Sequence, residues 1–199
     1  MRNIQPARRR QIRVALCVFV LLAAVPALAH VTPNVQLVRK GEFVKQSLPG
    51  ASRFLEKQLT LGESDLADIR RRTHWTPSEE EVKVYVGRDG QGQLVGSVVF
   101  LWMPSEHGPV GLGVAFDRGG RIVRAEVTDI ASEPLAWTEP LLRADGMAAF
   151  TGLPLASPPD PAKVAPGVSG RMSRYYAEVI AGGVARAQAI EQAALGTSK

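Results

Sequence analysis

The segment before the last helical stretch of the chain carries the residue types best suited to bind an anion. It runs Pro166-Gly-Val-Ser-Gly-Arg-Met-Ser173, and a helix is expected to begin at about Arg171. The first N–H groups of a helix have no partner within it, so with the helix dipole they favour negative charge. Hydroxyls, an open backbone and a guanidinium would add donors suited to a phosphate, from Ser169, Gly170, Arg171 and Ser173. A second interpretation stays open, in which Ser169 or Ser173 only caps the helix and Gly170 makes the turn.

No other set of side chains has the spacing of a catalytic or metal site. The three histidines, His30, His74 and His107, lie far apart and lack neighbouring ligands at metal-binding spacing. If residues 1–29 are removed, His30 begins the chain, where an amino group beside an imidazole can bind copper; an arbitrary terminus is the simpler interpretation. The Gly-x-Ser-x-Gly turn of hydrolases is missing from the sequence. We therefore predict no catalytic residue and no metal ligand.

Residues 1–29 have the composition of an export signal. Five arginines precede an apolar run from Val14 to Val25, and Pro26 and two small residues at the −3 and −1 positions follow. The run is shorter than the roughly 20 apolar residues that span a bilayer. We predict cleavage after Ala29, with an uncleaved anchor as the alternative. The single cysteine, Cys17, would leave with the signal, so the mature chain would have no disulfide.

The net charge of +5 belongs to the same N-terminal segment. The chain has 24 basic and 19 acidic residues, and without the five arginines of residues 1–29 it has 19 of each. An isoelectric point near 9.7 would ordinarily suggest nucleic acid or an anionic membrane as partner. A neutral mature chain lacks that basic surface. We expect no nucleic-acid partner, and a location in the periplasm or on the extracytoplasmic face of the membrane.

The apolar patterns predict an α+β fold. Residues 31–72 have helical spacing, and Thr60-Leu-Gly-Glu63 resembles a capping box that opens a second helix. Four strands joined by Gly-rich turns should then form an antiparallel meander, over residues 82–86, 94–103, 110–116 and 122–130. A short helix is expected over 134–145 and a long, Ala-rich helix over 171–195. Gly182-Gly183 would let the long helix pack closely on the sheet.

The order of these segments resembles the FMN-binding domain family, which includes the RnfG and NqrC subunits of ion-pumping redox complexes. Residues 82–99 and 108–127 are similar to the family's two hairpins, and Phe150-Thr-Gly152 to its Phe-x-Gly. Val168-Ser-Gly170 is similar to the Ile-Ser-Gly-Ala-Thr signature that closes the domain. The resemblance covers residues 61–195 and implies an FMN-binding-like domain there. Before it come the expected signal over 1–29 and an N-terminal helical segment over 30–60.

The chain departs from this family at two places. The threonine that carries covalent flavin in some members aligns with Met172, which has no hydroxyl, and Ser173 comes one residue late. The expected Gly-rich segment after Glu133 reads Pro-Leu-Ala-Trp137 instead. The resemblance therefore implies non-covalent FMN, with Trp137 as a candidate neighbour of the isoalloxazine ring or, equally, a core or partner contact. The phosphate would be held by Ser169, Gly170, Arg171 and Ser173.

Two functions follow from these expectations. In the first, the chain is an exported FMN-binding flavoprotein that takes part in electron transfer at or near the membrane, with a membrane-associated redox protein as partner. In the second, it is a cofactor-free fold relative that acts as a periplasmic interaction or accessory module, as Met172 and the segment after Glu133 suggest. A third possibility is another phosphorylated or anionic ligand at the same helix entrance. An electron-transfer or binding protein is expected in preference to a stand-alone enzyme.

Overall fold

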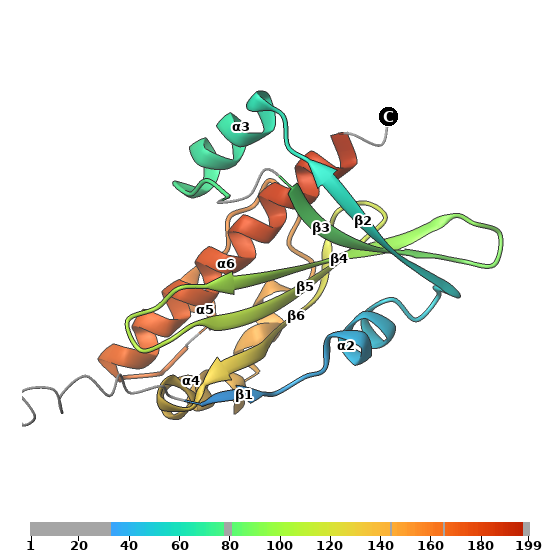
Figure 1. The fold of residues 1–199 in the computed structure, drawn as a ribbon. Helices are drawn as coiled ribbons and strands as arrows, with labels where there is room; N and C mark the ends of the chain where they lie inside the picture. The colour runs from blue at the N-terminus through green and yellow to red at the C-terminus, as the bar shows by residue number, and fades with distance from the viewer. Residues whose placement is uncertain (1–32, 78–80, 144, 165, 197–199) are drawn as a thin grey trace, which may run out of the picture. The chain divides into compact units, whose positions relative to one another are not determined.

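The strands of the protein form one antiparallel sheet, with helices on both of its faces (Figure 1). The structure, a computed structural model, describes residues 33–77, 81–143, 145–164 and 166–196. The strand order across the sheet is β1-β6-β5-β4-β3-β2. The elements in chain order are β1 (Asn34–Gln36), α2 (Lys40–Ser47), β2 (Arg53–Thr60), α3 (Glu63–Thr73), β3 (Glu81–Arg88), β4 (Leu94–Met103), β5 (Val110–Asp117), β6 (Ile122–Ala131), α4 (Ser132–Arg143), the 3₁₀ helix η2 (Gly146–Phe150), α5 (Pro161–Val164) and α6 (Arg171–Gly196).

The α+β class and the central meander are confirmed. Strands β3 to β6 are the four predicted strands, each paired antiparallel with the next. The sheet has six strands instead of four, because β1 pairs with β6 and β2 pairs with β3 at the two edges. The helices predicted over 134–145 and 171–195 correspond to α4 and α6.

The helical prediction for residues 31–72 is correct for α2 and α3 but wrong for residues 34–36, which form the edge strand β1, and for residues 53–60. Residues 53–60 form the other edge strand, β2, whose Leu59 lies opposite Val82 of β3. Leu59 is the one buried side chain of β2, so the alternating pattern that marks a half-buried strand is missing from its sequence. The capping box also differs. Helix α3 begins after Gly62, whose N–H donates to the Asp65 carboxylate at 3.0 Å, instead of pairing Thr60 with Glu63.

Alternate residues of β4 face two different helices, which sets the layers of the fold. Val98 and Phe100 pack in a cluster with Phe43 of α2, whereas Val99 and Leu101 pack in the main core with α6. Phe43 meets Phe100 edge to face at 5.7 Å. Helix α6 therefore lies along one face of the sheet, and its two ends lie near different strands. Within the part of the chain that the structure describes, no helix has the length and apolarity needed to cross a bilayer.

Candidate functional site at the start of the long helix

The first turn of α6 is open to solvent and free of acidic residues. Ser169, Gly170 and Arg171 are exposed, and no acidic residue lies in the first turn. The carbonyl of Gly170 accepts the first helical hydrogen bond, from the Arg174 N–H at 3.1 Å. Gly170 thus occupies the cap position, and a side chain added there would come within 3.3 Å of the Ser173 Oγ. The unpaired N–H groups that follow it remain available to an anion.

The two serines of this segment, Ser169 and Ser173, differ in exposure. Ser173 is only 7% exposed, so most of its side chain is covered by the protein. The Ser169 carbonyl accepts a hydrogen bond from Arg174 Nη1 at 2.9 Å. Among the described residues, neither serine makes a side-chain hydrogen bond that caps the helix. Of the four residues expected to hold a phosphate, Ser169, Gly170 and Arg171 are accessible and Ser173 is not.

A hollow of about 460 Å³ adjoins this helix start, between the Pro-rich loop and α6. Its wall includes Arg174, which favours an anion, but also Asp160 and Glu178, which repel one. The Asp160 carboxylate already accepts a hydrogen bond from the Ala162 N–H at 3.0 Å. An anion would therefore be favoured at residues 169–171 and not in the depth of the hollow.

Trp137 lies in an aromatic cluster beside the second turn of α6, made of His107, Trp137, Tyr175 and Tyr176. The Trp137 ring stacks on Tyr176 with centroids 6.1 Å apart and planes 18° from parallel. His107 meets Trp137 edge to face at 4.8 Å. Because Tyr176 comes five residues after Arg171, the structure brings Trp137 to the same end of α6 as the predicted phosphate-binding residues.

Hydrogen bonds tie the β4–β5 loop to this aromatic cluster. The hydroxyls of Ser105 and Tyr176 lie 3.0 Å apart, and the Tyr175 hydroxyl accepts from the Glu106 N–H at 3.2 Å. His107 Nδ1 lies 3.2 Å from a carboxylate oxygen of Glu133 at the start of α4. Desolvation by burial raises the pKa of Tyr176 above that of an ordinary tyrosine. The loop, α4 and α6 are thereby held in one arrangement at this end of the sheet.

Sequence reasoning missed three members of this site, namely His107, Glu133 as its partner, and Tyr176. They come from separate segments, so no spacing within one segment could identify them. Among the described residues no group of three or more His, Cys, Asp or Glu side chains could hold a metal ion. His30, the residue considered for copper, lies outside the described residues.

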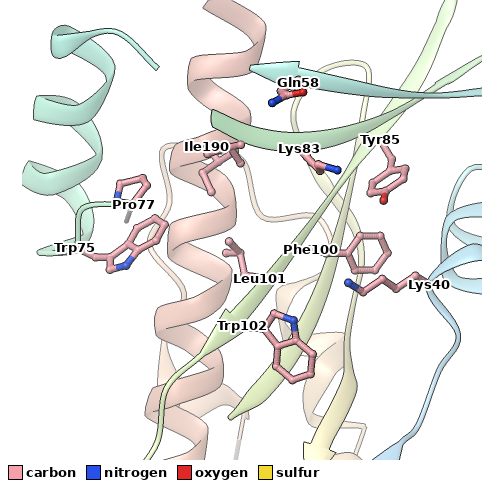
Figure 2. A pocket seen from close by; sticks show the side chains of 11 residues that line it. Lys40, Gln58, Trp75, Pro77, Lys83, Tyr85, Phe100, Leu101, Trp102 and Ile190 are labelled. Carbon is pink, nitrogen blue, oxygen red and sulfur yellow. The ribbon is translucent and has the colours of Figure 1, made fainter. Parts of the chain in front are cut away.

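A second hollow, of about 450 Å³, lies where β3 and β4 separate (Figure 2). Their pairing ends at Val84 and Val99, although β4 continues to Met103. Trp102 on the diverging part of β4 is 49% exposed, and Lys40 lies 5.3 Å from the Phe100 ring centroid. The hollow is lined by Lys40, Gln58, Trp75, Pro77, Val82, Lys83, Tyr85, Phe100, Leu101, Trp102 and Ile190.

Two comparisons with known proteins give no match. The chain matches no protein-family model, and a search of curated proteins finds no match either. The resemblance to the FMN-binding domain family consequently rests on the motifs quoted above.

Proposed function

We propose that the chain is an exported protein that binds FMN non-covalently and takes part in electron transfer at or near the membrane, with a membrane-associated redox protein as partner. The observation that carries this proposal is the joint location of two features at one end of α6. The first turn of α6 has no acidic residue and has an exposed Arg171. It lies one turn away from the stacked pair of Trp137 and Tyr176.

The residues at this helix end fit the two parts of FMN. The exposed N–H groups after Gly170 and the Arg171 guanidinium are the donors that a phosphate prefers. The aromatic cluster offers flat apolar surface to a planar ring system, since Trp137 is only partly buried. When bound, the flavin supplies the redox chemistry, while the protein orients the ring and tunes its electrostatic surroundings. Met172 in place of a threonine favours non-covalent binding.

We expect the protein, expressed from its full sequence and purified as it accumulates, to take up FMN and to release it on acid precipitation. Replacing Arg171 by Glu should weaken FMN binding roughly tenfold to a hundredfold, because a charge-assisted hydrogen bond is worth about 1.5–3 kcal/mol. The matched control is Arg118→Glu, the same change at another exposed arginine in the β5–β6 turn. Flavin fluorescence quenching measures both affinities.

Two results would contradict this assignment. A protein that stays colourless after FMN is added lacks the cofactor site altogether. Equal losses of affinity in the Arg171 and Arg118 variants would mean that only overall charge matters, and the phosphate would then have to bind elsewhere.

The second candidate function, a cofactor-free interaction module, is supported by the separation of β3 and β4. Among the described residues, Phe100 to Met103 of β4 have a paired strand only on the β5 side. Unpaired strand edges bind extended peptide segments by main-chain hydrogen bonds. The half-exposed Trp102 beside this edge could anchor such a segment of a partner protein.

A photo-crosslinking side chain introduced at position 102 tests this second function in the intact cell. The module function predicts a defined protein adduct at position 102 and none at position 55, where Leu55 on β2 is similarly exposed at 53%. Adducts at both positions, or at neither, would contradict docking at this edge.

A further inference from the structure

At the opposite end of α6, two buried polar side chains lie close together, and one oxygen atom of each lacks a hydrogen bond of regular geometry. Glu191 is 2% exposed and Ser97 of β4 is 5% exposed. Glu191 Oε2 and Ser97 Oγ have no hydrogen bond of regular geometry to any described residue, although the Ser97 hydroxyl lies close enough to the Glu191 carboxyl to lower its pKa. Leaving a buried polar atom unpaired costs about 1–3 kcal/mol, and more for a charged group. A native structure that keeps two such atoms together calls for a partner that supplies the missing hydrogen bonds.

Both side chains line a cavity of about 250 Å³ between β2, β3 and β4 and the last turns of α6. This volume is several times the roughly 30 Å³ that one water molecule occupies in the liquid. It is smaller than the roughly 300–1,000 Å³ of sites that hold drug-sized ligands. Most of its wall is aliphatic, formed by Val84, Val86, Leu94, Ala194 and Leu195. The cavity therefore suits a small molecule with an aliphatic body.

The acidic group of the cavity comes from α6, whereas its two basic groups come from β2 and β3. The carboxyl of Glu191 and the hydroxyl of Ser97 together suit a group with several donors, such as an ammonium. Lys57 of β2 and Arg88 of β3 also line the cavity and carry positive charge. One N–H of Arg88 donates to the Gly92 carbonyl at 2.7 Å, and a guanidinium has four more. A simple amine would be repelled by these two cations, whereas a molecule that also has a carboxylate would be attracted.

We propose that this cavity binds a small aliphatic α-amino acid. Its ammonium would donate to Glu191 and Ser97, its carboxylate would lie toward Lys57 and Arg88, and its side chain would contact the aliphatic wall. The site is independent of the proposed FMN site, because Glu191 lies 18 positions after Ser173 along the helix, a distance of about 27 Å. Figure 1 shows this end of α6 near β2 and β3.

The proton affinity of Glu191 adds a pH dependence to this binding. Desolvation raises the pKa of Glu191 from 4.5 to about 7, while the Ser97 hydroxyl and the Lys57 charge lower it by smaller amounts. An ammonium binds the ionised carboxylate and not the neutral acid. Amino-acid affinity should therefore rise as the pH increases from 6 to 8, since the carboxylate forms over that range.

Three probes of nearly equal size test the proposal by isothermal titration of the protein expressed from its full sequence. They are L-leucine, 3-methylbutylamine, which lacks the carboxylate, and 4-methylpentanoate, which lacks the ammonium. Leucine is expected to bind at least tenfold more tightly than either analogue. Binding of 4-methylpentanoate as tight as that of leucine, or no binding of any probe, would overturn the proposal.

Variants of two glutamates on α6 test whether leucine binding depends on the cavity or on the charge of the helix in general. Glu191→Gln is expected to weaken leucine binding tenfold or more and to abolish its dependence on pH. Glu178→Gln, the same change at an exposed position, is expected to leave both unchanged. A thermal melt of each variant checks that it is folded. A folded Glu191→Gln protein that binds leucine like the parent would also overturn the proposal, whatever the outcome of the FMN experiment.

Discussion

Replacing Gly183 by alanine is expected to destabilise the protein by about 1–2 kcal/mol. A methyl group at this position would lie 2.2 Å from Leu112 Cδ1 and 2.9 Å from Met103 Cγ. Both side chains are buried in the main core, so they have little room to move. Overpacking of this kind costs roughly 1–3 kcal/mol, from which the better helix propensity of alanine recovers up to about 1 kcal/mol.

The neighbouring glycine provides a control with the opposite sign. A methyl group at Gly182 meets only Met103 Cε, at the ordinary contact distance of 4.0 Å. Gly182→Ala should therefore stabilise the protein by about 0.5–1 kcal/mol through helix propensity and a less flexible unfolded chain. Urea unfolding of both variants measures the difference. Equal effects of the two substitutions would show that α6 does not approach the sheet at Gly183.

Replacing Glu191 by glutamine is expected to change how stability depends on pH. The pKa of Glu191 is raised from 4.5 to about 7 by burial, so the native state holds its proton more tightly than the unfolded chain. The free energy of unfolding of the parent protein should then fall between pH 4.5 and pH 7, by about 3 kcal/mol in total. Below pH 4.5 this carboxyl is protonated in both states, and above pH 7 it is ionised in both.

The test compares the parent and Glu191→Gln proteins by denaturant unfolding at pH 4 and pH 8, without added amino acid. Any packing cost of glutamine is common to both pH values and cancels. The variant should gain about 3 kcal/mol relative to the parent at pH 8 compared with pH 4. Glu178→Gln, on the exposed face of the same helix, should show no such gain. A constant difference between parent and Glu191→Gln at both pH values would mean that Glu191 is not buried.

Several elements could be predicted from the sequence because their signals are local. Strands β4 to β6 are apolar segments bounded by Gly-rich turns, and α6 combines Ala-rich composition with helical spacing, so each is visible within about 25 residues. The close approach at Gly183 was also predicted, since glycine inside a helix costs stability unless something packs against it. The exposed Arg171 and Gly170 at the helix start follow from the same local reasoning.

Other features depend on contacts between distant segments, and only the tertiary structure decided them. Residues 53–60 have helical spacing but form a strand, because their backbone pairs with β3. The side chains of this edge strand do not indicate that pairing. His107, Trp137 and Tyr176 meet although they lie on three separate segments. In the sequence, Glu191 is an ordinary polar residue of an Ala-rich helix, and only the packing of α6 in the folded protein buries its side chain. By itself the sequence determined the α+β class, the meander and the helix start that suits an anion. The packing of distant segments decided which side chains are in contact and which charged groups are desolvated. Neither property can be read from a single segment of the sequence.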